Sequence, residues 1–216
     1  MVSQSFQLSD MFFITRGLGI TLLLCAIAMV FGAAIGLIMG IMRASKVRLL
    51  KSISWGYIYI IRGTPLLMQL FLIYYGLPLL IGYSIPSFTV AAGGLSLYAG
   101  AYLAEIVRSG IQAVDRGQGE AAKALGMNFF QEYRYVVLPQ AFRVIVLPGF
   151  GFFIALIKDS SLVSAIGYIE LARAGKLIVA RTFQPFTVYL IIAALYFVIC
   201  FSLSRVSQKL ERTVRG

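Results

Sequence analysis

The sequence predicts an all-α integral membrane protein with five transmembrane helices, and its composition and apolar runs both support this. Of its 216 residues, 60% are hydrophobic and only 12% are charged, whereas a soluble domain has about 25% charged residues. Five apolar runs approach or exceed the ~20 residues that a helix needs to cross a bilayer. No polar stretch is long enough to fold alone, so we expect one membrane domain over residues 1–216.

The five apolar runs follow one another along the chain. They cover residues 17–42, 53–80, 88–108, 141–162 and 186–203. In the first run, Ala28, Gly32, Gly36 and Gly40 recur at every fourth position. Small residues at this spacing let helix backbones approach closely. We expect the stripe to pack within the chain, and the alternative is a seam between two copies.

The basic residues predict the orientation. If the N-terminus lies outside, thirteen Lys and Arg residues fall on the inner side: Arg43, Lys46, Arg48, Lys51, Arg108, Arg116, Lys123, Arg134, Arg143, Arg205, Lys209, Arg212 and Arg215. Four fall outside: Arg16, Arg173, Lys176 and Arg181. Basic residues concentrate on the cytoplasmic side of membrane proteins. We therefore expect the N-terminus outside and the C-terminus inside, and the net charge of +11 does not indicate nucleic acid.

Two connections are long enough to hold helices of their own. In the inner loop, about 109–140, we expect a helix from Glu120 to Leu125 that ends at a left-handed Gly126. A second helix should follow the N-cap Asn128, with Gln131 closing a capping box, and end before Pro139. This rigid hairpin is either a docking surface for another protein or an amphipathic hairpin on the membrane. The outer segment 164–184 predicts an interfacial helix.

The inner loop also carries a motif. Its fixed residues, at fixed spacing, are Glu120, Ala121, Ala122, Gly126, Val136, Leu138 and Pro139. This pattern resembles the EAA loop of binding-protein-dependent ABC importer permeases, with Val136 where that family has Ile. Segments 62–69, 102–110 and 158–162 resemble the polar amino acid branch of the family. The resemblance implies that Glu120, Ala121, Ala122, Gly126, Leu138 and Pro139 couple the permease to an ATPase.

The resemblance further implies a type I importer in the inner membrane of a prokaryote. Its parts would be two permease chains, expected to be identical, two cytosolic ATPase subunits that bind ATP and magnesium, and an extracytoplasmic substrate-binding protein. The chain itself has no G-x-x-x-x-G-K-[ST] phosphate loop and no histidine. We therefore expect no catalytic site, metal or cofactor in this chain. The alternative is a secondary transporter or channel for small polar solutes.

Polar residues within the apolar runs are the candidates for the substrate site, because ionisable groups at membrane depth are costly and mark transport pathways. Asp159 could accept the ammonium of an amino acid, and the hydroxyls of Ser160 and Ser161 could donate to its carboxylate or to the backbone. Glu170 could fold over the same cavity. Two carboxylates would favour a basic amino acid. In the alternative, Asp159 forms a salt bridge with Arg62 or a partner lysine.

Three further residues could line the same cavity: Arg62, Gln69 and Tyr102. Pro65 should kink the second run and free the carbonyl of Ile61, beside a buried Arg62. Glu105 and Arg108 lie three residues apart on one helix, a spacing that predicts a structural ion pair.

Overall fold

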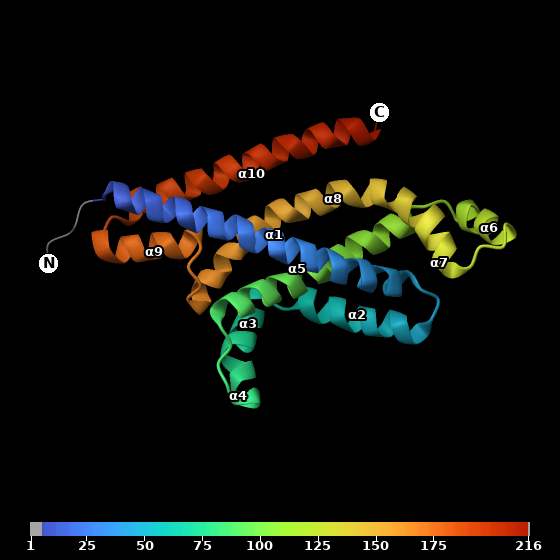
Figure 1. The fold of residues 1–216 in the computed structure, drawn as a ribbon, viewed down its shortest axis with the longest axis horizontal. Helices are drawn as coiled ribbons and strands as arrows, with labels where there is room; N and C mark the ends of the chain where they lie inside the picture. Colours follow the sequence, from blue (N-terminus) through green and yellow to red (C-terminus); the bar gives the residue numbers. More distant parts are fainter. Residues whose placement is uncertain (1–5, 216) are drawn as a thin grey trace.

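The computed structural model describes residues 6–215, with side chains up to residue 212. Within this range every regular element is helical. The long helices are α1 (Leu8–Ala44), α5 (Ser87–Gln112), α8 (Leu138–Asp159) and α10 (Pro185–Arg215). The shorter ones are α2 (Arg48–Gly63), α3 (Leu66–Phe71), α4 (Leu77–Ile81), α6 (Arg116–Ala124), α7 (Phe129–Gln131) and α9 (Leu171–Thr182). Figure 1 shows the long helices running roughly alongside one another, with α3 and α4 projecting away from them.

The small-residue stripe of α1 lies against α5. A Cβ atom added at Gly32 would come within 2.5 Å of the Cβ of Ala99, and one added at Gly36 within 2.6 Å of the Cβ of Leu103. Only glycine permits so close an approach of the two backbones. The expected packing within the chain is confirmed, and these glycines are buried without any second copy.

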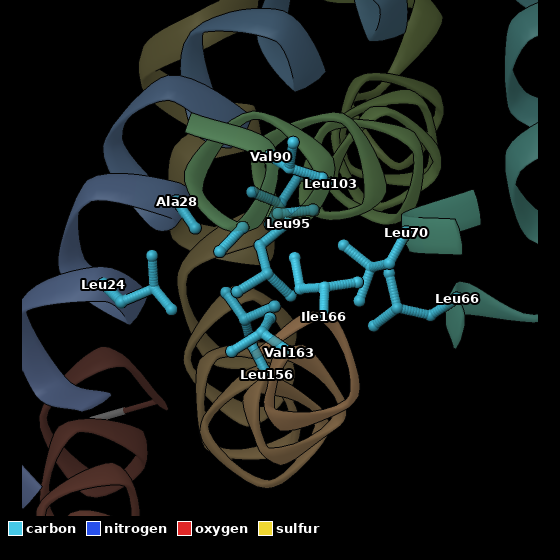
Figure 2. Close-up of a cluster of buried hydrophobic side chains, with 12 residues drawn as sticks. Leu24, Ala28, Leu66, Leu70, Val90, Leu95, Leu103, Leu156, Val163 and Ile166 are labelled. Carbon is cyan, nitrogen blue, oxygen red and sulfur yellow. The ribbon is translucent and has the colours of Figure 1, made fainter. Parts of the chain in front are cut away.

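The main hydrophobic core joins five segments of the chain around α5 (Figure 2). Its labelled side chains are Leu24, Ala28, Leu66, Leu70, Val90, Leu95, Leu103, Leu156, Val163 and Ile166. They come from α1, α3, α5, α8 and a 3-10 helical segment, Ser160–Ile166, that follows α8. The core therefore packs α3 and the 3-10 segment after α8 against the same central helix and against each other.

The second apolar run is bent at Pro65, as expected, but far more sharply than a kinked helix. It consists of α2 and a second helical stretch, Leu66–Ile81, bent by 103° relative to each other. The break lies at Thr64 and Pro65, because Pro65 lacks an N–H and holds Thr64 in an extended conformation. Within the described residues, four helices are long and apolar enough to cross a membrane, and the number becomes five if the bent pair is one span.

The hairpin at 109–140 forms as expected in its turn and differs at both ends. Gly126 has a φ of +75°, the predicted left-handed conformation. The Asn128–Gln131 capping box is also present, with bonds of 3.0 and 2.9 Å. The first helix begins earlier than predicted, at Arg116, because the Asp115 carboxylate accepts a hydrogen bond from the Gly117 N–H at 2.7 Å.

We had predicted that the second helix of the hairpin ends before Pro139, and this prediction is wrong. The chain stays helical from Phe129 to Ile166, passing through a π-helical turn, Glu132–Val137, and then Leu138 in the right-handed helical region. In a π-helical turn each carbonyl accepts a hydrogen bond from the N–H five residues ahead. This wider turn leaves room for the proline ring and tolerates the missing N–H of proline. The hairpin is thus continuous with α8.

The outer segment 164–184 contains the expected helix, α9. It packs on α1 and α10, with Leu171, Ala174 and Ile178 buried. Gly17 of α1 lies close to the backbone of Leu171. The segment is therefore part of the packed bundle within this chain.

Candidate functional site

The break between α2 and α3 is held by Gln69. Its side-chain amide donates to the carbonyl of Ile61 at 2.7 Å and to the carbonyl of Thr64 at 3.0 Å. The freed Ile61 carbonyl that Pro65 predicts is thus present, and Gln69 satisfies it. Because its amide nitrogen binds these backbone groups, Gln69 holds the bend between α2 and α3. We had expected it on the cavity wall.

Arg62, the penultimate residue of α2, points at α5. Its guanidinium lies over the ring of Tyr102, 5.0 Å from the ring centroid, a distance typical of a cation–π interaction. Tyr102 also stacks on Phe152 of α8, with centroids 5.3 Å apart and planes 16° apart. Arg62 is exposed and lines an open hollow, so the expectation of a buried cation is wrong.

Asp159, the last residue of α8, contacts the neighbouring ring on α5. The Tyr98 hydroxyl donates to Asp159 Oδ2 at 3.3 Å, and the Tyr98 and Tyr102 ring centroids are 4.7 Å apart. Among the described side chains Asp159 makes no ion pair, so the alternative salt bridge to Arg62 is absent from this conformation.

The contacts of Asp159, Tyr98, Tyr102 and Arg62 join these four side chains into one polar and aromatic strip. We define the α5 strip as Asp159, Tyr98, Tyr102 and Arg62 in order of contact. Tyr98 and Tyr102 are four residues apart, and Glu105 is three further on, so all three lie on one face of α5. A negative group therefore lies at one end of the strip and a positive group at the other.

The two serines after Asp159 bond to the backbone. Ser160 Oγ donates to the carbonyl of Ile157 and Ser161 Oγ to that of Lys158, both at 2.8 Å. These hydroxyls add hydrogen bonds to the backbone where α8 passes into the 3-10 helical segment. Of the two roles that we considered for the serines, the structure shows the backbone role.

Glu170 has a structural role, contrary to our expectation. It is fully buried, and its carboxylate accepts hydrogen bonds from the backbone N–H groups of Ala172 and Arg173 at 2.9 and 2.8 Å. The hydroxyls of Thr21 and Tyr196 donate to it from α1 and α10 at 3.4 and 3.2 Å. Burial raises the pKa of Glu170. Because four donors surround it, Glu170 caps α9 and joins three helices, and it does not face a cavity with Asp159.

The residues of the predicted coupling motif form an exposed knob at one end of the molecule (Figure 1). Glu120, Ala121, Gly126 and Pro139 are exposed, Leu138 is half-buried and Ala122 is buried. An ion pair of 3.6 Å between Lys123 and Glu132 joins the two arms of the hairpin. Leu125 and Phe130 are 78% and 81% exposed. Sequence reasoning missed these two side chains, which make the knob apolar and suited to contact another surface.

The chain is similar in sequence to known amino-acid permeases. The chain is 39% identical over 198 residues to a probable amino-acid ABC transporter permease of Bacillus subtilis, YckA, covering 92% of this chain and 87% of the relative. It is 37% identical over 201 residues to a putative glutamine transport system permease of Rickettsia conorii, GlnP, covering 93% and 92%. It is also 35% identical over 204 residues to the arginine transport system permease ArtQ of Bacillus subtilis, covering 94% and 93%.

A solved structure shares the fold closely. A crystal structure of an amino acid ABC transporter with histidines superposes with a TM-score of 0.86 at 40% identity, covering 97% of this chain and all of that one. The methionine transporter MetNI has the same fold, with a TM-score of 0.77 at 23% identity, covering 95% and 99%. Residues 32–216 match the family described as binding-protein-dependent transport system inner membrane component. The chain therefore belongs to this family, the membrane permeases of ABC importers.

Proposed function

We propose that this chain is the membrane permease of an ATP-driven importer of free amino acids. The α5 strip is the observation that carries the substrate class. It presents a carboxylate at Asp159 that has no ion-pair partner among the described side chains, and a guanidinium at Arg62, joined by Tyr98 and Tyr102. A free amino acid carries the complementary ammonium and carboxylate. A secondary transporter or channel would have no use for an exposed apolar knob.

In the proposed assembly the bent pair of α2 with α3 and α4 is one span, so the chain crosses the inner membrane of a prokaryote five times. The N-terminus is outside and the C-terminus inside. Two identical permeases bind two cytosolic ATPases, which hold ATP and magnesium, and an extracytoplasmic protein delivers substrate. The knob formed by α6 and α7 docks the ATPase through Glu120, Ala121, Ala122, Gly126, Leu138 and Pro139, and transmits its closure.

Asp159 is the substrate contact that this proposal depends on. Its carboxylate accepts a cationic group of the amino acid, while Ser160 and Ser161 fix the end of α8 and Tyr102 and Arg62 form the wall. Because Glu170 lies in the helix packing, Asp159 alone remains of the two carboxylates, Asp159 and Glu170, that had favoured a basic amino acid. The proposed substrate class is therefore polar amino acids, and a basic side chain is one of its members.

The substrate assignment is tested by uptake into vesicles that contain the whole complex. Asp159→Asn keeps the shape of the side chain and removes its charge. We expect it to abolish uptake of whichever of L-arginine, L-glutamine and L-cystine the wild type takes up, while assembly and basal ATP hydrolysis persist. Lys158→Gln, which removes a charge at the neighbouring position, is the matched control and should transport normally. Normal uptake by Asp159→Asn, or a complex that no longer assembles, would contradict the assignment.

The orientation is tested by labelling single cysteines with an impermeant thiol reagent, after replacement of Cys25 and Cys200. Ser84→Cys lies in the exposed turn before α5, and Gln118→Cys lies in α6. We expect reagent added outside intact cells to modify Ser84→Cys and to leave Gln118→Cys unmodified until the membrane is opened. The reverse pattern would overturn the proposed orientation.

A further inference from the structure

A second group of charged side chains surrounds a hollow of about 500 Å³ between α1, α2 and α5. The polar residues that line it are Arg43, Tyr59, Arg62, Tyr102, Glu105 and Arg108. Three guanidinium groups face one carboxylate, so the lining has an excess of two positive charges. Asp159 is not among the residues that line it. The hollow thus shares Arg62 and Tyr102 with the α5 strip and does not include Asp159 at the other end of the strip.

Glu105 has one carboxylate oxygen engaged and one free for a ligand. Both hydrogen bonds from Arg108, one of them at 2.8 Å from Nε, go to Oε1 of Glu105. No other described residue donates to Oε2. The Arg108 guanidinium is further held by Gln112. The expected ion pair of Glu105 and Arg108 is therefore confirmed, and it presents a fixed carboxylate oxygen at the edge of the hollow.

Arg62 and Arg43 supply the positive side of the hollow. Within the described residues neither of them makes an ion pair. The Tyr102 ring and the break at Pro65 fix the end of α2 from which Arg62 projects. A guanidinium held over an aromatic ring still presents its N–H groups to a carboxylate in the plane of the fork.

We infer that this hollow is a second binding station, which holds the zwitterionic head of the amino acid: its α-carboxylate on Arg62 and its α-ammonium on Glu105. The inference rests on the proposed function. In the proposed orientation Glu105 lies seven residues before the cytoplasmic end of α5 at Gln112, so this station follows Asp159 on the way in. Arg43, at the inner end of α1, adds to the attraction for the carboxylate.

The proposed binding of the zwitterionic head is tested with a ligand that lacks the charge of the α-carboxylate. The measurement is competition between a labelled amino acid and its α-amide for the purified complex of permease and ATPases. The amino acid is whichever of L-arginine, L-glutamine and L-cystine the wild type takes up. We expect the α-amide to bind about tenfold more weakly, because it lacks the charged partner of Arg62. Equal competition by the α-amide, or uptake without measurable binding, would overturn the inference.

Variants then test whether Arg62 binds the α-carboxylate and Glu105 the α-ammonium of the amino acid. Arg62→Gln should weaken binding of the amino acid about tenfold and bring it level with the α-amide. Glu105→Gln, which can still accept from Arg108, should weaken binding of the amino acid and leave that of its N-acetyl derivative unchanged. Arg48→Gln removes an exposed cation at the other end of α2 and is the matched control, expected to bind like the wild type.

Three outcomes would overturn the inference, and they show whether the proposed function fails with it. If Arg62→Gln weakens the amino acid and the α-amide equally, Arg62 is structural and the inference is wrong. If wild-type binding depends on the phosphatidylglycerol content of the vesicles and Arg62→Gln removes that dependence without any α-amide discrimination, the hollow holds a lipid headgroup and the inference is wrong. If the wild type takes up no amino acid, the proposed function fails, and the inference fails with it.

Discussion

The side-chain amide of Gln69 donates to the backbone carbonyl of Ile61 across 2.7 Å, from the far side of the break between α2 and α3. The same nitrogen reaches the carbonyl and the hydroxyl of Thr64, at 3.0 and 2.9 Å. One side chain thus replaces the helical hydrogen bond to Ile61 that Pro65 cannot make, and it also binds Thr64. Because Gln69 is 8% exposed, water cannot readily take over this role.

Removal of this amide should therefore destabilise the bend. Gln69→Leu keeps the approximate volume and leaves the carbonyl oxygens of Ile61 and Thr64 without this donor, at a cost of about 1–3 kcal/mol in the free energy of unfolding. We expect a lower midpoint of thermal unfolding for the purified protein in detergent. Gln208→Leu, on the exposed surface of α10, is the control and should leave the midpoint unchanged. Equal midpoints for the two variants would show that Gln69 does not hold the bend.

The contact between α1 and α5 makes a second prediction. An added methyl group at Gly36 would lie 2.6 Å from the Cβ of Leu103 and 3.1 Å from backbone atoms, so the helices would have to separate. We expect Gly36→Ala to destabilise the protein by about 1–3 kcal/mol, as overpacking does. The measurement is thermal unfolding in detergent.

The control for this prediction lies on the same helix. Gly19 has open space where its Cβ would be, and alanine is a better helix former than glycine. Gly19→Ala should therefore be neutral or stabilising. A destabilising effect at Gly19 as large as that at Gly36 would mean that the loss comes from the helix itself and not from the contact with α5.

The helical runs, the Gly126 turn and the Asn128 cap could be predicted from the sequence because each depends on local chemistry. Gly126 needs only its own lack of a Cβ, and Asn128 needs only the N–H groups of the next turn. The glycine spacing in α1 also predicted a close contact, although not which helix would make it.

The errors concern residues whose role depends on distant partners. Glu170 stands in a polar segment and looks available, but Thr21 and Tyr196 reach it from α1 and α10. A proline usually ends a helix, yet the π-helical turn before Pro139 lets the helix continue. Arg62 was expected to be buried because its neighbours are apolar, whereas it is exposed in this chain, near the end of α2 and just before the 103° bend.

The turn of the knob gives a third prediction, which also tests the proposed docking. Gly126 has a φ of +75°, a conformation that costs a residue with a side chain about 1–2 kcal/mol, and more for a β-branched one. Gly126→Val should distort the knob, so that ATP hydrolysis continues while uptake of amino acid falls. The measurement is the ratio of uptake to hydrolysis in vesicles that contain the whole complex.

Ala124→Val is the matched control, since it adds the same side chain at an exposed helical position two residues earlier. We expect it to keep the wild-type ratio of uptake to hydrolysis. If Gly126→Val also kept that ratio, the knob formed by α6 and α7 would not be the coupling element.

Glu170 gives the fourth prediction, a dependence of stability on pH. Burial raises its pKa above the ordinary value of 4.5, so the folded protein holds this proton more tightly than the unfolded chain does. The free energy of unfolding should therefore fall as the pH rises from 4.5 through the raised folded value, and this slope should level off above it. Glu170→Gln cannot titrate and keeps one oxygen that can accept an N–H group at the start of α9, so it should lose that slope. Thermal unfolding across this pH range measures both proteins, and parallel curves would exclude Glu170 as the titrating group.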